Sequence, residues 1–240
     1  MHILVLGSGL LGVTTAYELA KRGFKVTVLD RQPQSGAETS FANGGQLSYN
    51  HAEPWASPGS LAKLPGWLIR DDAPLVFRLR ADWQMIRWGL RFLRNCTTRR
   101  AQENCITLLR LGLYSKEQFA RLRAETDVAF DFTGKGILHI FDNQDEFDAA
   151  RRQNDFQAKF GGDERPLTAE ECLTMEPSLT HTKRTIIGGF HAHMDECGDA
   201  FLFTTALAKI AAERHGVEFR YGIDIKELVA KQGQIVAVKT

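Results

Sequence analysis

The segment from Met1 to Asp30 carries the clearest pattern of apolar and polar positions in the chain. It opens with a continuous apolar run, Ile3, Leu4, Val5 and Leu6, which is typical of a buried parallel strand. A glycine-rich turn, an apolar stripe at helical spacing and a second group of strand-forming residues follow. The predicted elements are a strand over His2–Leu6, a helix ending near Arg22 and a second strand ending at Asp30. Together they make a βαβ unit.

The turn has the spacing G-x-G-x-x-G at Gly7, Gly9 and Gly12. In a dinucleotide-binding unit the first glycine permits the tight turn, the second lets the backbone approach a pyrophosphate, and the third lets helix and strand pack closely. The helix N-terminus then directs amide N–H groups at the phosphates. Asp30 follows about 20 residues on, where a carboxylate can accept hydrogen bonds from ribose hydroxyls. The pattern therefore predicts a site for the ADP half of a dinucleotide.

The remaining pattern alternates between helical and extended stretches. Helices are predicted over Asp82–Asn95, Ala101–Glu125, Asp145–Phe160, Ala169–Met175 and Ala200–His215, the fourth with Thr168 as N-cap. Strands are predicted over Val128–Phe132, Gly136–Phe141, Thr185–His191 and Ile235–Lys239, the last after a turn at Lys231–Gln234. This order predicts an α/β fold: a Rossmann-like domain formed by 1–50 and 199–240, with an inserted α+β substrate domain over 51–198.

Composition changes this picture little. A chain of 240 residues can bury a sizeable core, and its net charge of +1 gives no signal for nucleic acid. The four cysteines have no CxxC spacing, so they favour a reducing cytoplasm and predict neither a zinc site nor a disulfide framework. The N-terminus lacks the basic region of a signal peptide, and no apolar run approaches the roughly 20 residues of a membrane span.

One basic stretch stands out from this balanced composition. Between Arg70 and Arg100 there are eight arginines and three aspartates, and the predicted helix over Asp82–Asn95 is rich in tryptophan and aliphatic residues. Such a helix can lie on an anionic membrane surface. It can equally be a buried helix whose arginines extend from its edges to water. The sequence leaves both interpretations open.

Two further groups of polar residues could carry chemistry. On one strand His191, His193 and Asp195 would share a face, as metal ligands do, but a strand end beside a turn explains them equally well, and we expect no metal. His51 near Glu53 could act as a general base. Removal of a hydride from an amine carbon needs little beyond an oriented neutral amine, so the catalytic residues are left unassigned.

The residues after Asp30 bear on the choice of nucleotide. Instead of a short connection to another strand, a long loop of small and polar residues follows, which can wrap a second phosphate and reach towards an isoalloxazine ring. This loop favours FAD over NAD, and the Asp30 carboxylate would repel the 2′-phosphate of NADP. An ordinary surface loop is the alternative.

The segments VLGSGLLGVTTAYELAKRGFKVTVLDRQP, GAETSFANGGQLS and EPWASPGS resemble the small subunit of bacterial D-amino acid dehydrogenases. These belong to the FAD-dependent oxidoreductases, together with D-amino acid oxidase, glycine oxidase and sarcosine oxidase. The resemblance continues to GGFHAHMDECGDAFLFTTALAKIAAERHGVEFRYG, near the end of the chain. Family members are longer, so the resemblance implies an N-terminal portion.

The resemblance implies FAD as cofactor and the oxidative deamination of D-amino acids to 2-oxo acids and ammonia. Electrons would pass to a respiratory acceptor such as a quinone, with the protein cytoplasmic or peripheral on the cytoplasmic face of the inner membrane. The alternatives are a truncated module that binds FAD or NAD without turnover, and an oxygen-using amino acid or secondary-amine oxidase.

The resemblance also implies which residues bind FAD. Arg31, Ser40, Asn43, Gly44, Gly45 and Gln46 would line the pyrophosphate and flavin side, Asp30 would bind the ribose, and Ile225, with Val217–Phe219, would lie near adenine. The βαβ segment would contribute Ile3, Leu4, Val5, Leu6, Gly7, Ser8, Gly9, Leu10, Leu11, Gly12, Val13, Thr14, Thr15, Ala16 and Tyr17.

Overall fold

The computed structural model describes residues 1–61 and 82–240, and these fold into two compact units. The first unit comprises Met1–Leu47, Phe119–Lys135 and Glu196–Thr240, and the second comprises Ser48–Gln118 and Gly136–Asp195. Besides the ranges expected for a nucleotide-binding domain, the first unit contains 119–135, which the sequence pattern places in the substrate domain.

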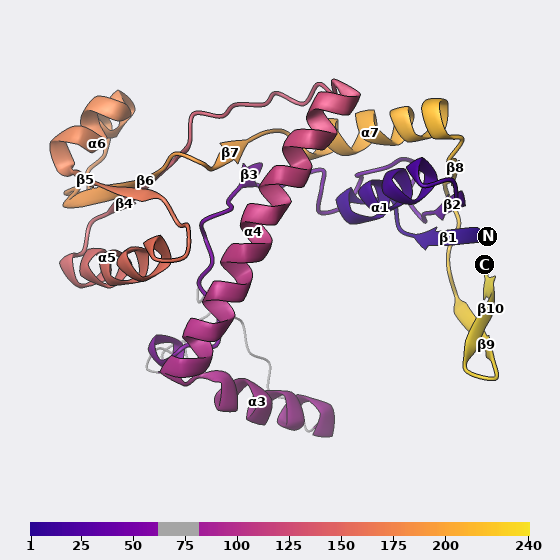
Figure 1. The fold of residues 1–240 in the computed structure, drawn as a ribbon, viewed down its shortest axis with the longest axis horizontal. Helices are drawn as coiled ribbons and strands as arrows, with labels where there is room; N and C mark the ends of the chain where they lie inside the picture. Colours follow the sequence, from indigo (N-terminus) through magenta and orange to yellow (C-terminus); the bar gives the residue numbers. More distant parts are fainter. Residues whose placement is uncertain (62–81) are drawn as a thin grey trace. The chain divides into compact units, whose positions relative to one another are not determined.

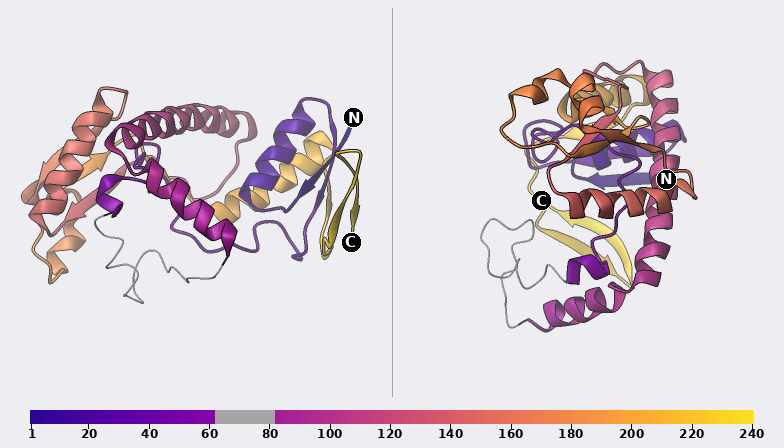
Figure 2. Two further views of the ribbon diagram at one scale, coloured as in Figure 1. Left: turned by 90° about the horizontal axis from the view of Figure 1, so that it is seen from below. Right: turned by 90° about the vertical axis from the view of Figure 1, so that its left-hand side faces the viewer.

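The first unit is built on a parallel sheet with the strand order β1-β2-β8. The strands are β1 (His2–Leu6), β2 (Lys25–Leu29) and β8 (Glu218–Arg220). The crossover from β1 to β2 is helix α1 (Leu10–Lys21), and helix α7 (Ala200–His215) packs beside it, as Figures 1 and 2 show. The predicted βαβ unit and the predicted bounds of α7 are confirmed.

The core of the first unit lies where the two helices meet the sheet. Val13, Ala16 and Tyr17 of α1 are buried against Leu207 and Ala211 of α7 and the strands. Small residues at 16 and 211 let the helices approach closely, and the buried apolar area stabilises the unit. Gly216 directly follows helix α7 and caps it in the left-handed conformation, with a φ of 68°.

Two short antiparallel pairs complete the first unit. Strand β3 (Gln46–Leu47) pairs with β7 (Glu196–Cys197), and β9 (Glu227–Lys231) pairs with β10 (Gln234–Lys239). Gln232 and Gly233 both have positive φ, as a tight hairpin turn requires, so the predicted turn at Lys231–Gln234 is confirmed. Figure 2 shows this hairpin in yellow at the C-terminal end.

The predicted strand over Val128–Phe132 is wrong. Asp127 and Asp131 have φ values of 52° and 53°, which interrupt an extended conformation on both sides of Phe130. Phe130 is nevertheless buried, against Phe119 and Phe203. The alternation of apolar residues at 128–132 therefore reflects a loop in which Phe130 is buried, not a strand. Just after this loop, Thr133 forms an isolated antiparallel bridge with Cys197.

The second unit contains an antiparallel sheet with the order β4-β6-β5. Figure 1 shows helices α5 and α6 on opposite sides of it. The elements are β4 (Ile137–Phe141), α5 (Gln144–Ala158), β5 (Glu164–Thr168), α6 (Ala169–Met175), the 3-10 helix η1 (Pro177–His181) and β6 (Gly188–Ala192). Strand β5 is missing from the sequence prediction because it contains Pro166, which a strand accommodates at the edge of a sheet.

Helix ends in the second unit follow from local sequence. The Thr168 hydroxyl accepts from Glu171 N–H while the Glu171 carboxylate accepts from Thr168 N–H, so the predicted N-cap of α6 is confirmed as a full capping box. Helices α3 (Trp83–Asn95) and α4 (Thr98–Thr126) match the helices predicted over Asp82–Asn95 and Ala101–Glu125. Of the arginines in the basic stretch between Arg70 and Arg100, those at 70, 78 and 80 lie outside the described residues.

Candidate functional site

The glycine turn between β1 and α1 has a different physical reason for each glycine. Gly7 has a φ of 95°, in the left-handed region that favours glycine, and its N–H donates to Leu29 O at 2.8 Å. A Cβ on Gly12 would lie 1.9 Å from Gly7 O, so this position excludes any side chain. A Cβ on Gly9 would meet nothing closer than Ser40 Oγ, at 3.7 Å. Folding therefore does not require glycine at position 9, whereas close approach of a ligand to the backbone would.

The N-terminus of α1 faces the polar loop that follows Asp30. Leu10 N–H donates to Ser40 Oγ at 3.2 Å, and the first turn of the helix carries no acidic side chain. The first turn of the helix therefore adds no negative charge of its own to offset the partial positive charge of this helix end. An anionic group such as a pyrophosphate would be stabilised there.

Asp30 connects the end of β2 to this turn. Its Oδ2 accepts from Ser8 N–H at 2.5 Å and from Ser8 Oγ at 2.7 Å, and its Oδ1 accepts from Gln32 N–H at 2.7 Å. Ser8 is fully buried. Asp30 thus shapes the turn as well as presenting a carboxylate beside it.

These groups border a cavity of about 530 Å³ within the first unit. The residues predicted from the sequence that line it are Leu6, Gly7, Gly9, Asp30, Arg31, Ser40 and Ile225. Glu38 and Ile223 also line it, although neither was among the predicted site residues. The Arg31 guanidinium donates to Glu38 Oε1 at 2.6 and 2.8 Å, and Gln32 Nε2 donates to the same oxygen. These hydrogen bonds, from Gln32 and then Arg31, lower the pKa of the Glu38 carboxyl.

Other predicted residues serve this part of the unit without lining the cavity. The side chains of Val13, Ala16 and Tyr17 belong to the core and hold α1 against the sheet. Asn43 Oδ1 accepts from Gly45 N–H at 2.8 Å, and a Cβ on Gly45 would lie 2.6 Å from Gly198 O. The predicted residues outside the cavity lining are Ile3, Leu4, Val5, Ser8, Leu10, Leu11, Gly12, Val13, Thr14, Thr15, Ala16, Tyr17, Asn43, Gly44, Gly45 and Gln46.

The three residues considered as metal ligands do not converge. Asp195 is fully buried, and its Oδ1 accepts from Tyr49 N–H at 2.8 Å and from Asn50 N–H at 3.2 Å. His193 Nε2 lies 2.7 Å from Asp163 Oδ2. Within residues 1–61 and 82–240, no group of three or more histidine, cysteine, aspartate or glutamate side chains is arranged to hold a metal ion.

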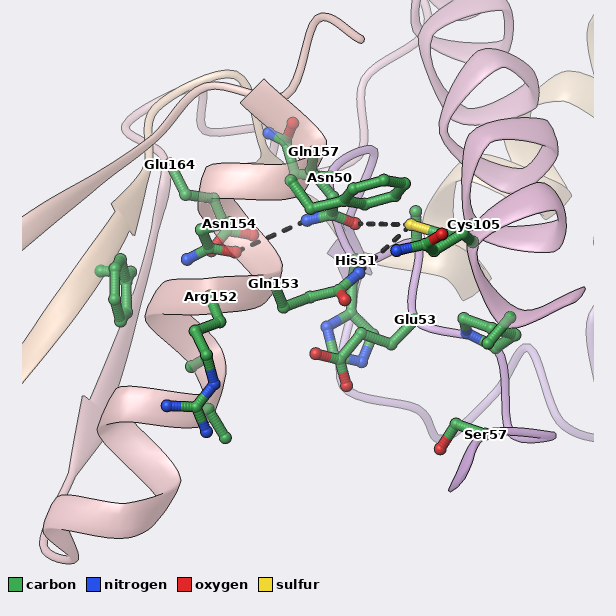
Figure 3. A pocket seen from close by; sticks show the side chains of 18 of the residues that line it. Asn50, His51, Glu53, Ser57, Cys105, Arg152, Gln153, Asn154, Gln157 and Glu164 are labelled. Carbon is green, nitrogen blue, oxygen red and sulfur yellow. Dashed lines mark hydrogen bonds between the residues drawn. The ribbon is translucent and has the colours of Figure 1, made fainter. Parts of the chain in front are cut away.

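A second cavity, of about 640 Å³, lies within the second unit (Figure 3). On one side, α5 contributes three amide side chains that form a hydrogen-bonded chain with Cys105 of α4. Gln157 Nε2 donates to Asn154 Oδ1, Cys105 Sγ donates to Gln157 Oε1, and Gln153 Nε2 donates to Cys105 Sγ. The segment from Asn50 to Glu53 lines the cavity as well, so His51 and Glu53 both border it.

Burial changes the protonation of two groups at this second cavity. It raises the pKa of the Glu164 carboxyl to about 7, although a hydrogen bond from Asn154 opposes the shift. Burial also lowers the pKa of the His139 imidazole, and the nearby His51 adds to this effect. The His139 ring stacks on His51, with the centroids 6.2 Å apart. The cavity therefore holds a carboxyl that keeps its proton to a higher pH than usual and an imidazole that loses its proton at a lower pH than usual.

Comparison with known proteins adds to this geometry. The profile of the family described as FAD dependent oxidoreductase matches residues 2–240. A D-amino acid dehydrogenase of Dechloromonas aromatica (strain RCB) is 44% identical over 238 residues, which cover 99% of this chain and 57% of that protein. A D-amino acid dehydrogenase of Paramagnetospirillum magneticum (strain ATCC 700264 / AMB-1) is 44% identical over 241 residues, which cover 100% of this chain and 57% of that protein. The chain thus spans 57% of the length of these curated relatives.

Among solved structures, the chain is similar to the glycine oxidase of Bacillus cereus ATCC 14579, with a TM-score of 0.64 and 22% identity. The similarity covers 98% of this chain and 51% of the glycine oxidase chain. At this level of identity the comparison shows the fold alone.

Proposed function

Since the chain belongs to the family of FAD-dependent oxidoreductases, we propose that it serves the oxidative deamination of D-amino acids to 2-oxo acids and ammonia. The observation that carries the proposal is the 44% identity to a D-amino acid dehydrogenase over 99% of the chain. This similarity includes the second unit as well as the glycine turn that many flavoproteins share. It therefore favours an amino acid dehydrogenase over a bare nucleotide-binding module.

Three features of the first unit support binding of the ADP half of FAD at its cavity. The open space at Gly9 allows close approach of a pyrophosphate, and the α1 N-terminus supplies amide donors with no carboxylate in its first turn. Asp30 stands at the ribose position of the βαβ motif, and Arg31 and Ser40 border the same cavity. We assign these residues to the cofactor, with Ile225 towards the adenine.

When bound, FAD supplies the acceptor for the hydride that leaves the substrate Cα. The residues of the chain have to bind the amino acid, orient its Cα–H bond and exclude water. A neutral, oriented amine needs no further base for this step, so we assign no catalytic acid or base, and His51 has no assigned role.

We further propose that the electrons pass to a respiratory quinone rather than to oxygen, with the protein peripheral on the cytoplasmic face of the inner membrane. The name dehydrogenase, rather than oxidase, of both curated relatives supports this choice of acceptor. No helix among the described residues is long and apolar enough to cross a bilayer.

The test is the visible absorption spectrum of the purified chain, before and after anaerobic addition of D-alanine, with L-alanine as the control. A flavin band that D-alanine alone bleaches would support both FAD binding and D-amino acid oxidation. A band that no member of a D-amino acid panel bleaches would contradict the proposed activity of this chain while leaving FAD binding intact. A chain that takes up no added FAD would contradict both.

The rate at which the reduced flavin is reoxidised separates the two acceptors. After D-alanine has bleached the flavin, air and a soluble ubiquinone analogue are added to separate samples. We expect rapid return of the flavin band with the quinone and slow return with air. The opposite order would favour an oxygen-using amino acid or secondary-amine oxidase.

A further inference from the structure

Helix α3 (Trp83–Asn95) is the most strongly amphipathic of the longer helices in the part of the chain that the structure describes. Asp82 caps its first turn by accepting from Gln84 N–H at 2.9 Å, and Cys96 N–H donates to Leu93 O at its end. The helix therefore has defined ends and presents a fixed set of side chains on each face.

The polar and apolar side chains of α3 occupy separate arcs. At 3.6 residues per turn, Arg87, Arg91 and Arg94 fall on one side of the helix together with Gln84 and Asn95. The rest of the circumference is apolar: Trp83, Met85, Ile86, Trp88, Gly89, Leu90, Phe92 and Leu93. A globular core needs a narrower apolar stripe than this.

Much of the apolar arc is exposed. No residue of α3 is buried, and Met85 and Phe92 are only partly covered. Trp83 is 72% exposed, Leu90 is 57% exposed and Trp88 is 50% exposed. The alternative of a buried helix with arginines reaching out from its edges is therefore wrong for the described residues. An exposed apolar surface with this much aromatic area marks an interaction site.

The charge of the helix indicates what covers that surface. Trp83–Asn95 contains three arginines and no acidic residue, so every charged side chain on its polar side is cationic. Tryptophan prefers the headgroup level of a bilayer, where its ring is apolar and its N–H is polar. Arginine stems can lie along apolar surface while the guanidinium reaches lipid phosphates. An anionic lipid surface matches all three features.

We propose that α3 binds the protein to an anionic membrane surface, lying in the headgroup region with its apolar arc inserted and Arg87, Arg91 and Arg94 at the lipid phosphates. The inference deepens the proposed function and rests on it for the purpose of attachment, because a membrane quinone can be reached only at the bilayer. Attachment itself does not depend on flavin chemistry, so the two proposals can fail separately.

The test is flotation of the purified chain with vesicles of phosphatidylcholine, with and without phosphatidylglycerol. We expect binding to the anionic vesicles only, with a blue shift of tryptophan emission that Trp83→Phe and Trp88→Phe together reduce. The variant Arg87→Gln/Arg91→Gln/Arg94→Gln should bind about 100-fold more weakly, since each basic residue near an anionic surface contributes about a factor of five. The variant Trp83→Ser/Leu90→Ser should also lose most binding.

The matched control, Arg151→Gln/Lys159→Gln/Lys183→Gln, removes the same charge from exposed positions outside α3. It should bind the anionic vesicles within about twofold of the parent, and circular dichroism should show that every variant keeps its helix content.

Equal loss of vesicle binding in the control would mean general charge attraction and would overturn the inference. No binding by the parent, or a dimer that Trp83→Ser/Leu90→Ser dissociates, would overturn it as well. If the chain oxidises D-alanine but does not bind vesicles, only this inference is contradicted. If it binds anionic vesicles but oxidises no D-amino acid, only the proposed activity is contradicted.

Discussion

Asp30 accepts two hydrogen bonds from Ser8, one from its backbone N–H and one from its hydroxyl, and so ties the end of β2 to the glycine turn after β1. Ser8 is fully buried, so the hydroxyl donates inside the fold. The carboxylate predicted to bind ribose therefore also fixes the loop that would hold the pyrophosphate. The two roles can be separated by substitution.

Asp30→Ala should weaken FAD binding by roughly 1–3 kcal/mol, because the ribose acceptor is lost and Ser8 is left with unsatisfied donors. Ser8→Ala removes only the hydroxyl donor and keeps the bond from Ser8 N–H. We expect it to lower the unfolding free energy by about 1 kcal/mol and to leave the FAD dissociation constant nearly unchanged. Fluorescence titration with FAD measures the dissociation constant of both variants, and urea unfolding measures their unfolding free energy. Equal weakening in both would show that Asp30 acts on the turn and not on the ribose.

Gly9 and Gly12 should respond differently to the same added methyl group. Gly9→Ala meets no backbone atom, so its unfolding free energy should stay within about 1 kcal/mol of the parent. Flavin retention should nevertheless fall, and fall further in Gly9→Val, because the Cβ occupies the path of the pyrophosphate. Urea unfolding and the flavin-to-protein absorbance ratio report the two properties.

Gly12→Ala is the contrasting variant. Its Cβ would lie 1.9 Å from Gly7 O, so the turn has to open and the chain should lose several kcal/mol of stability even without FAD. Gly9→Ala protein that purifies with a full complement of flavin would remove Gly9 from the proposed cofactor site.

Glu164 should make the second unit less stable as the pH rises. Its pKa in the folded chain is about 7, above the ordinary value of 4.5, because burial disfavours the carboxylate. The folded state then holds a proton that the unfolded state has released, so this contribution is fully present below about pH 4.5 and is lost as the pH rises through about 7. Partial exposure to water reduces its size to about 1–2 kcal/mol.

Glu164→Gln tests this directly, because the amide is neutral at every pH. We expect the variant to unfold at a higher urea concentration than the parent at pH 8, and at a similar one at pH 4.5. Glu146→Gln, which removes an exposed carboxylate at the same cavity, should track the parent across the whole range. Parallel pH profiles for the parent and Glu164→Gln would contradict the raised pKa.

Asp195 holds the start of the second unit in place. Its Oδ1 accepts from Tyr49 N–H, Asn50 N–H and Asn50 Nδ2, all within the buried interior. Asp195→Ala should therefore cost about 2–4 kcal/mol of unfolding free energy, since three donors lose their acceptor. Asp195→Asn keeps one oxygen for these donors and should cost less than half as much. If urea unfolding shows equal losses, charge rather than hydrogen bonding would be the property that matters.

Features that depend on neighbouring residues in the chain were predictable. The βαβ turn, the capping box of Thr168 and Glu171, and the bounds of α7 follow from local hydrogen bonds, helical spacing and the conformational freedom of glycine. The resemblance to FAD-dependent oxidoreductases, which rests on sequence motifs, is confirmed by the family match over residues 2–240. The amphipathic spacing of α3 was equally visible, since it needs only the order of its residues.

Features that depend on residues distant in the chain were decided by the tertiary structure. An apolar alternation at 128–132 cannot reveal that Asp127 and Asp131 adopt positive φ, because Phe130 is buried by partners far away in sequence. Whether α3 is buried or exposed depends on what packs against it, not on its spacing. The same is true of the Ser8–Asp30 bonds and of the raised pKa of Glu164, which arise from desolvation and contacts that only folding creates. The sequence by itself determined the nucleotide-binding motif and the local elements, and tertiary packing decided which side chains are buried, bonded or left facing solvent.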